Sequence, residues 1–327
     1  MLKCQGPTSY ERPSSKETPL STPSAHRSAG SRKGETLKMT GIELLQWAIS
    51  TLKEHRIENP RLNAEVLLAH SLNFNREELY VRLYREFDEG EKGTLGKLVQ
   101  RRISGEPLQY ILGHQEFWSI QFKVDPRVLI PRPETELLVE QSLSILSEGT
   151  FGRNPSVLEI GTGSGAIAVA LAKEVKKFFL VATDISRDAL ILAKENAKSA
   201  GVQDQIRFVN GDLLGPFHSS KEGGVFDLIL SNPPYIIRSE IGSLAKEVRD
   251  HEPVIALDGG EDGFDFYRHL IPQARSYLRK GGWLLLEVGQ GQAERVARQI
   301  RGSEAFLKPQ ILPDLAGIER VVKAQRK

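Results

Sequence analysis

The first part of the chain with a regular apolar pattern reads as a bundle of helices. Four segments place apolar residues three or four positions apart, as helices that bury one face do. The first opens with Thr40-Gly-Ile-Glu43, a capping-box sequence in which each side chain caps the other's backbone. We expect the four helices to begin near Thr40, Arg61, Asn75 and Glu89, and the last to end near Ser104.

Beyond this bundle the apolar period changes. Between Tyr110 and Val128 apolar and polar residues nearly alternate, which predicts a β-hairpin. A helix is expected from Thr135 to Leu146, and then short apolar runs alternate with helical segments. The expected strands are Val157–Ile160, Phe179–Thr183, Ile206–Val209, Phe226–Leu230, Trp283–Val288 and Arg320–Ala324. An alternating β-α-β order predicts an α/β fold with a doubly wound, mostly parallel sheet.

These patterns divide the chain into four predicted parts. Residues 1–38 form a disordered leader, because 18 of them are Ser, Thr, Pro or Gly and no apolar period appears. Residues 39–112 form a small helical domain and residues 113–130 a β-hairpin linker. Residues 131–327 form the α/β domain.

Charge and cysteine content narrow the function classes. The chain has 44 Lys/Arg and 42 Asp/Glu, a net charge of +2, so nothing in the total demands a nucleic-acid partner. Cys4 is the only cysteine, which predicts no disulfide, no thiol nucleophile and no cysteine-based metal site; we expect a reducing cytoplasm and no metal. No apolar run is long enough for a membrane span.

A glycine-rich turn follows the first strand of the predicted sheet. Glycines at this position let the backbone turn sharply and let a ligand approach the main chain. Glu159 directly precedes the turn, and a carboxylate there repels the pyrophosphate of NAD but favours the ammonium of S-adenosylmethionine. The candidate residues for binding S-adenosylmethionine are Glu159, Gly161, Thr162, Gly163, Ser164 and Gly165.

Two further strand ends carry candidate cofactor contacts. Asp184 ends the second strand, where a carboxylate can accept the ribose hydroxyl protons. Asp212 and Leu213 follow the third strand, where an adenine ring is expected. Asp212 is a candidate acceptor for the exocyclic amine, and Leu213 either packs on the ring or belongs to an ordinary polar loop.

The fourth strand ends in Asn232-Pro233-Pro234-Tyr235, the candidate catalytic loop. The two prolines hold an extended backbone and remove two N–H donors, which leaves the Asn232 side-chain oxygen and the Pro233 carbonyl as acceptors. These match the two hydrogens of a planar NH2 group and aim its nitrogen at a methyl donor, while Tyr235 offers an aromatic face. Asn232 is also a candidate cofactor contact.

Several separated motifs resemble the protein-glutamine N5-methyltransferases of the PrmC/HemK type. The matching stretches are Gly105 to Gly113, Glu116-Phe-Trp118, Leu129-Ile-Pro-Arg-Pro-Glu-Thr-Glu136, Glu159 to Gly165, Ser231 to Tyr235 and Gly317-Ile-Glu-Arg320. The resemblance implies a Rossmann-like domain that uses S-adenosylmethionine and a helical domain that helps hold a release factor. It also implies methylation of the glutamine in the factor's Gly-Gly-Gln loop, during the maturation of the translation-termination machinery.

Alternatives remain at this point. The Asn-Pro-Pro-Tyr motif also occurs in enzymes that methylate a glutamine of a ribosomal protein or an amino group of a nucleic-acid base. The stretch from Leu129 to Glu136 favours release factors. Within it, Arg132 and Glu134 either line the substrate entrance or form a salt bridge at a helix start. We expect a monomer that binds neither nucleic acid nor membrane.

Overall fold

The computed structural model describes residues 38–147, 151, 154–218 and 224–327. The predicted leader therefore lies outside the described residues, apart from Lys38. Contacts divide the chain into two compact units, one ending at Ser104 and the other spanning Gly105–Lys327. The domain limits expected from the sequence stay a prediction.

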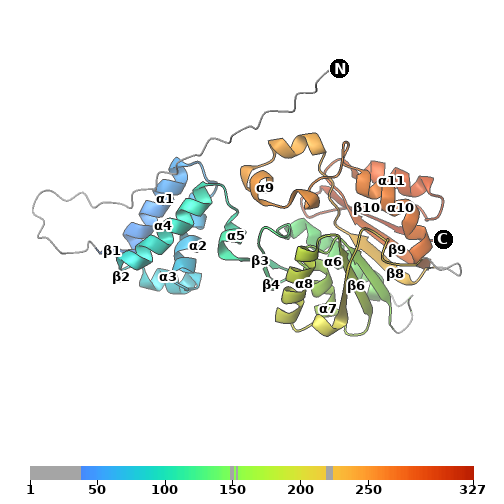
Figure 1. The fold of residues 1–327 in the computed structure, drawn as a ribbon, viewed down its shortest axis with the longest axis horizontal. Coiled ribbons are helices and arrows are strands. Elements are labelled where there is room, and N and C mark those ends of the chain that lie inside the picture. The colour runs from blue at the N-terminus through green and yellow to red at the C-terminus, as the bar shows by residue number, and fades with distance from the viewer. Residues whose placement is uncertain (1–37, 148–150, 152–153, 219–223) are drawn as a thin grey trace, which may run out of the picture. The chain divides into compact units, whose positions relative to one another are not determined.

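The first unit is the predicted bundle of four helices (Figure 1). They are α1 (Gly41–Glu54), α2 (Pro60–Ser71), α3 (Arg76–Arg82) and α4 (Glu89–Ile103). The capping box at Thr40 is confirmed, and Asn75 and Asp88 form two more. Apolar side chains spaced along each helix are buried between them, Leu44, Leu67 and Leu95 among them. A short pairing of β1 (Met39–Thr40) with β2 (Glu86–Phe87) was not predicted.

The second unit begins with the short helix α5 (Leu108–Leu112) and the predicted hairpin. Strands β3 (His114–Phe117) and β4 (Ile120–Lys123) pair antiparallel. The two residues between them, Trp118 and Ser119, have φ values of 53° and 55°, the left-handed conformation that tight hairpin turns require. A 3-10 turn (Pro133–Thr135) and α6 (Glu136–Ser147) then lead into the sheet.

A seven-stranded sheet forms the body of this unit, in the order β10-β11-β9-β8-β5-β6-β7. The strands are β5 (Ser156–Ile160), β6 (Phe179–Asp184), β7 (Ile206–Asn210), β8 (Phe226–Ser231), β9 (Leu278–Glu287), β10 (Gln310–Pro313) and β11 (Glu319–Gln325). Only β11 runs against the others, since it is antiparallel to both neighbours. The mostly parallel α/β sheet is confirmed. Its order differs from the dinucleotide-binding order 3-2-1-4-5-6 because β11 is inserted beside β9.

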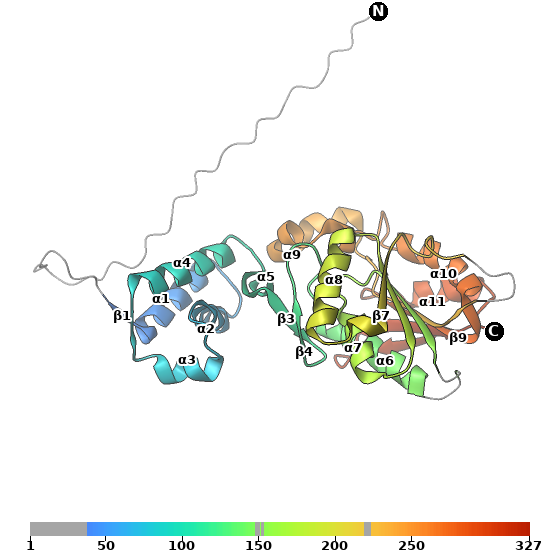
Figure 2. The same ribbon diagram turned by 60° about the horizontal axis from the view of Figure 1, so that its bottom comes forward.

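Helices cover both faces of this sheet, as a sheet buried on both sides requires (Figures 1 and 2). One apolar core packs α6 and α7 (Ala166–Glu174) against the sheet, together with the end of α8 (Arg187–Ser199). The other packs α10 (Asp265–Tyr277) and α11 (Ala293–Gly302). Adjacent residues of one strand enter opposite cores, as Val157 and Leu158 of β5 do.

Three details differ from the expected pattern. Helix α7 ends at Glu174 rather than Lys177, because Val175 already has an extended backbone. Strand β9 begins at Leu278 rather than Trp283, and its pairing with β8 shifts register on the way through Gly281. Strand β10 was missed because it is a short edge strand that ends in proline.

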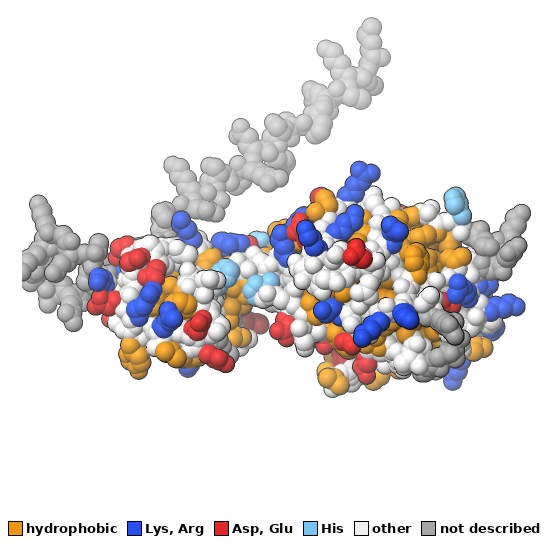
Figure 3. Space-filling model, turned by 90° about the horizontal axis from the view of Figure 1, so that it is seen from below, with side chains coloured by type: hydrophobic (Ala, Val, Ile, Leu, Met, Phe, Trp, Pro, Cys, Tyr) orange, Lys and Arg blue, Asp and Glu red, His pale blue; other side chains and the backbone are white. Residues whose placement is uncertain are grey.

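The segment between β8 and α10 was also not predicted. It contains 3-10 turns at Arg238–Ser243 and Val254–Ala256, with α9 (Lys246–His251) between them. None of these has a long apolar period. On the face drawn in Figure 3, acidic and basic side chains both occur on each unit. Among the described residues, no helix has the length and apolar character needed to cross a bilayer.

Candidate active site

A cavity of about 420 Å³ lies at the carboxyl ends of the central strands β5, β6 and β8. This is where open α/β sheets bind ligands, and the volume suits a small organic molecule. Ten of the predicted site residues line it: Glu159, Gly161, Thr162, Gly163, Ser164, Asp184, Asp212, Leu213, Asn232 and Pro234. These ten residues come from four separate stretches of the chain, which the fold brings to one cavity.

The glycine turn after β5 has the backbone that the sequence predicts. Gly161, Gly163 and Gly165 have φ values of 74°, 54° and 81°. A Cβ added at Gly163 would meet no heavy atom within 4 Å, whereas one at Gly165 would lie 3.1 Å from the Ala193 Cβ of α8. Gly163 therefore leaves room for a ligand, and Gly165 allows α7 to approach α8. Gly165 does not line the cavity.

Glu159 is fully buried at the end of β5. Its Oε2 accepts a hydrogen bond of 2.8 Å from the Thr162 hydroxyl, while its Oε1 is buried with no hydrogen-bond partner among the described residues. Burial raises the pKa of Glu159 to about 8, although the Thr162 hydrogen bond opposes the shift. A buried, unsatisfied carboxylate in the cavity wall is suited to a cationic ligand group.

Asp184, at the end of β6, braces the glycine turn. Its two oxygens each accept a backbone N–H at 2.8 Å, from Gly163 and from Ser186. Burial raises its pKa, and these hydrogen bonds oppose the rise. Since an ionised carboxylate has about four acceptor positions, it can still accept ribose hydroxyls.

Leu213 has a strained backbone at the cavity wall. Its φ is 47°, a left-handed conformation that costs a residue other than glycine about 1–3 kcal/mol. Such strain persists where the surrounding structure enforces it, often at a ligand site. Asp212 lies beside it in the same wall.

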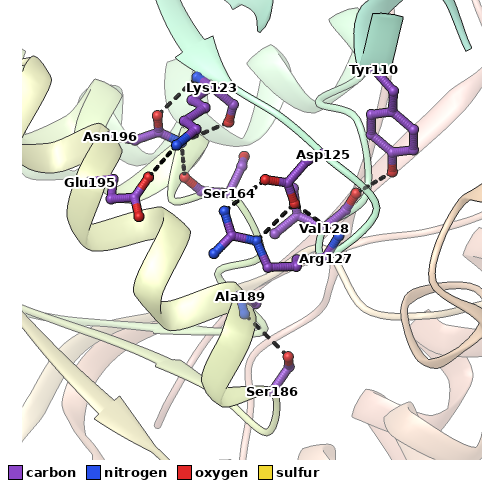
Figure 4. A network of polar contacts seen from close by, with 10 residues as sticks. All are labelled: Tyr110, Lys123, Asp125, Arg127, Val128, Ser164, Ser186, Ala189, Glu195 and Asn196. Atoms are coloured by element: carbon purple, nitrogen blue, oxygen red, sulfur yellow. Dashed lines mark hydrogen bonds and ion pairs between the residues drawn. The ribbon is translucent and has the colours of Figure 1, made fainter. Parts of the chain in front are cut away.

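The segment 123–128, at the end of the hairpin, forms one side of the cavity wall and is hydrogen-bonded to α8 (Figure 4). Asn196 donates to the carbonyls of Lys123 (3.0 Å) and of Ser164 in the glycine turn (2.8 Å). The Asn196 oxygen accepts from the Lys123 backbone N–H, and the Tyr110 hydroxyl donates to the Val128 carbonyl. Arg127 and Val128 are thereby held in the cavity wall.

The loop after β8 lies beside the glycine turn. A Cβ on Gly161 would lie 3.9 Å from the Asn232 backbone oxygen, and the Asn232 Nδ2 donates to the Thr135 hydroxyl at 3.1 Å. Pro233 is buried and is not part of the cavity wall. Tyr235 also lies outside the wall: its ring carbon Cδ2 is 3.0 Å from the Cβ position of Gly289, and its carbonyl accepts from Gln292.

Several wall residues come from stretches to which the sequence gave no clear role. Arg132 lines the cavity and pairs with Glu252 at 2.6 Å, whereas Glu134 pairs with Arg320 at 3.8 Å. Both side chains therefore form ion pairs and Arg132 lines the cavity, while a role at the substrate entrance stays a prediction. The segment after β8 and helix α10 supply further residues: Pro253, Ile255, Ala256, Asp258, Asp265, Phe266 and His269. No short motif marks these, because they reach the cavity only through the fold.

Comparison with known proteins identifies the family. A release factor glutamine methyltransferase from Moorella thermoacetica is 42% identical over 88% of this chain and 99% of its own length. One from Bradyrhizobium diazoefficiens is 41% identical over 84% of this chain and 91% of its own length. The chain belongs to the release factor glutamine methyltransferase family. The resemblance expected from the motifs is confirmed.

Two domain families match separate parts of the chain. The PrmC N-terminal domain matches residues 43–113, and the methyltransferase small domain matches residues 135–248. Among solved structures, the hMettl16 catalytic domain in complex with a MAT2A 3'UTR hairpin has a TM-score of 0.50 and 15% identity. It covers 70% of this chain and 81% of its own. At that identity the likeness concerns the fold alone.

The cavity fits the cofactor that a methyltransferase of this kind needs. The unsatisfied Glu159 oxygen suits an ammonium, and the open side of Gly163 leaves room for close approach to the main chain. Among the described residues, the wall contains no Lys and two Arg, and Arg132 is already paired with Glu252. This charge pattern favours S-adenosylmethionine over a pyrophosphate-bearing dinucleotide.

Proposed function

We propose that this chain transfers the methyl group of S-adenosylmethionine to the side-chain amide nitrogen of a glutamine, in the Gly-Gly-Gln loop of peptide chain release factors. The observation that carries the proposal is the position of the Asn232 loop beside the glycine turn on one cavity. The relatives named above support the substrate.

The proposed cofactor contacts follow the geometry of the cavity. Glu159 receives the ammonium, Asp184 the ribose hydroxyls, and Asp212 with Leu213 the adenine. The residues Thr162, Ser164 and Asn232, with the glycines of the turn, hold the rest. When bound, S-adenosylmethionine would supply the methyl group from its sulfonium, and its sulfur would leave as a neutral thioether.

Asn232 to Tyr235 hold the substrate amide in this proposal. The Asn232 side-chain oxygen and the Pro233 carbonyl accept its two N–H bonds and orient its nitrogen, a poor nucleophile whose lone pair is delocalised. These acceptors also favour the positive charge that develops on the nitrogen, so that a proton leaves only afterwards. Pro234 keeps the loop extended, and Tyr235 supports it.

The helical residues 39–112 are proposed to bind the release factor, and residues 113–130 to connect them to the catalytic residues 131–327. We further propose that the protein acts as a monomer in the cytoplasm, without binding nucleic acid directly. Sedimentation of the purified protein, alone and with DNA or RNA, checks the oligomeric state and the last point.

The test is a methylation assay with labelled S-adenosylmethionine and, separately, a release factor, a ribosomal protein and DNA. The release factor is expected to gain one methyl group, located by mass analysis of the tryptic peptide that contains Gly-Gly-Gln. Label in DNA or in the ribosomal protein alone would contradict the proposal. A release factor with glutamate in place of that glutamine is the matched control and is expected to stay unlabelled.

Asn232→Ala is expected to lower kcat at least about a hundredfold, since a directed hydrogen-bonding group in a transition state is worth that much. The same assay, at saturating cofactor, measures it. Wild-type activity in this variant would show that the loop is not the catalytic element.

A further inference from the structure

Three separate parts of the chain meet behind Asn232. Strands β8 and β9 are parallel and pair Ser231 with Leu286, so Asn232 and Glu287 occupy neighbouring positions at adjacent strand ends. Thr135, from the Leu129–Glu136 stretch, accepts the hydrogen bond from the Asn232 Nδ2 at 3.1 Å. Strand β11 pairs Val321 with Glu287, which brings Arg320 next to them.

Glu287 is a buried carboxylate to which the proposed mechanism assigns no role. It is 1% exposed, does not line the cavity, and interacts with both Thr135 and Asn232. Its Oε2 is buried and has no hydrogen-bond partner among the described residues. Burying a carboxylate oxygen without a hydrogen-bond partner costs free energy, so Glu287 is a candidate for a functional role beside Asn232.

We infer that Glu287 is a positioning residue, which acts together with Thr135 to hold the Asn232 amide with its oxygen toward the substrate. The inference rests on the proposed function. An ionised carboxylate only accepts hydrogen bonds, so in this arrangement it accepts one from the Thr135 hydroxyl and one from an Asn232 N–H. The Thr135 oxygen then accepts from Asn232 as well. Both partners face the NH2 end of Asn232, which leaves its oxygen for the substrate N–H.

Protonation of Glu287 removes this preference. A protonated carboxyl can donate to the Asn232 oxygen, and the Thr135 hydroxyl can turn to do the same. The Asn232 amide is then free to turn its NH2 group toward the substrate. Two NH2 groups that face each other are both donors, so no hydrogen bond forms between them.

Burial and the charges around Glu287 determine the pH at which it is protonated. Burial raises its pKa to about 7, with the charge of Glu134 adding to the rise and that of Arg320 opposing it. Arg320 pairs with Glu134 and Asp314. The phenols of Tyr235 and Tyr267 also interact electrostatically with Glu287, and the Tyr267 hydroxyl donates to the Glu287 backbone carbonyl at 2.7 Å. Both phenols stay neutral across this range, since burial raises each pKa.

The direct test observes the Asn232 side-chain amide by NMR in ¹⁵N-asparagine-labelled protein, with Asn232→Ala to assign the signal. In the wild type, the two N–H signals are expected to shift with a midpoint near pH 7. In Glu287→Gln they are expected to stay constant. Signals that do not titrate in the wild type, or that titrate equally in Glu287→Gln, overturn the inference. This measurement needs neither cofactor nor substrate.

Kinetics provide the second test. The wild-type kcat for the release factor is expected to fall about tenfold per pH unit below about pH 7. Glu287→Gln is expected to lose this acidic limb while keeping its affinity for S-adenosylmethionine, because Glu287 lies outside the cavity wall. Thr135→Val should lower kcat by roughly ten- to a hundredfold, and Thr135→Ser, which keeps the hydroxyl, should restore it.

Asp227→Asn is the matched control. It removes a buried carboxylate from the opposite end of β8 and is expected to keep the acidic limb. An acidic limb that survives in Glu287→Gln overturns the inference. Absence of any release factor methylation, with the NMR titration present, counts against the proposed function and leaves the positioning of Asn232 supported.

Discussion

Carboxylates of this unit differ in the direction in which their surroundings shift the pKa. Burial raises the pKa values of Glu159 and Glu287, because a charge without water is costly. Asp258 and Asp314 are near the surface, and their pKa values are lowered by hydrogen bonds to arginine and to backbone N–H groups. Ionisation of Glu159 and Glu287 therefore lowers the stability of the fold, whereas the ionised Asp258 and Asp314 stabilise it.

The sign of the Glu159 effect on stability follows from proton binding. Its pKa is about 8 in the folded chain and about 4.5 when unfolded, so between these values the folded state binds more protons. The free energy of unfolding therefore rises as pH falls from about 8 to about 4.5, and Glu159 contributes no further change below that. We expect Glu159→Gln to be more stable than the wild type above about pH 8, by on the order of a few kcal/mol, and equal to it at acid pH. Urea unfolding at several pH values measures the difference.

The same substitution tests the role of Glu159 in binding. Removing the carboxylate from an ammonium is expected to weaken S-adenosylmethionine binding about ten- to a hundredfold, since hydrogen bonds to charged groups are worth about 1.5–3 kcal/mol. Calorimetry measures the dissociation constant. Glu65→Gln removes a buried carboxylate from the helical unit and should leave that constant unchanged. Equal affinity in Glu159→Gln and the wild type would refute the contact.

At the scale of elements, the turn between β5 and α7 places a left-handed glycine in the cavity wall. Gly163 and Gly201 both have a left-handed backbone, with φ values of 54° and 72°, and a Cβ at either would meet no heavy atom within 4 Å. They differ in place: Gly163 lines the cavity, whereas Gly201 follows the end of α8. A substitution at Gly201 therefore reports backbone strain alone, whereas the same substitution at Gly163 reports strain together with any contact to a ligand.

We expect Gly163→Ala and Gly201→Ala each to lose about 1–2 kcal/mol of stability, the cost of an L-residue in this conformation. Only Gly163→Ala should also weaken S-adenosylmethionine binding, by about tenfold or more, because its methyl group occupies ligand space. Thermal unfolding and calorimetry measure the two effects. If both variants bind the cofactor like the wild type, the glycine turn does not contact it.

At the scale of the whole molecule, the cavity proposed to bind the cofactor belongs to one compact unit. All residues that line the cavity lie between Arg127 and His269, and both apolar cores of the sheet lie within Gly105–Lys327. The helical unit has its own buried leucines and its own capping boxes. Each unit therefore has the core that independent folding requires.

A fragment of residues 105–327 is expected to bind S-adenosylmethionine as tightly as the full chain. It should methylate a release factor with a kcat/KM at least about tenfold lower, because the proposed substrate-binding helices are missing. Calorimetry and the methylation assay measure these values, and circular dichroism checks that the fragment is folded. Unchanged kcat/KM would show that residues 39–104 do not help to bind the substrate.

Short-range patterns in the sequence predicted most of the helices and strands of this protein. Apolar periods, capping boxes and turn glycines located the four bundle helices, the hairpin and six strands of the sheet, because these signals act over a few residues. The glycine turn, Asp184 and the Asn232 loop were found for a related reason: in an α/β sheet, ligand-binding residues follow strand ends. Strand β10 and the segment between β8 and α10 lack a long apolar period, so pattern reading missed them.

What only the tertiary structure decided is which distant residues touch. Thr135, Glu287 and Arg320 are far apart in the sequence, and nothing in their local patterns connects them. Strand pairing between β8, β9 and β11 brings Glu287 and Arg320 to Asn232, and Thr135 contacts Asn232 through a hydrogen bond. Burial also raises the pKa of Glu287, because the whole fold excludes water from its carboxyl group. The sequence by itself therefore determined most of the helices and strands and the residues of the Asn232 loop, whereas packing determined which side chains surround the Asn232 amide.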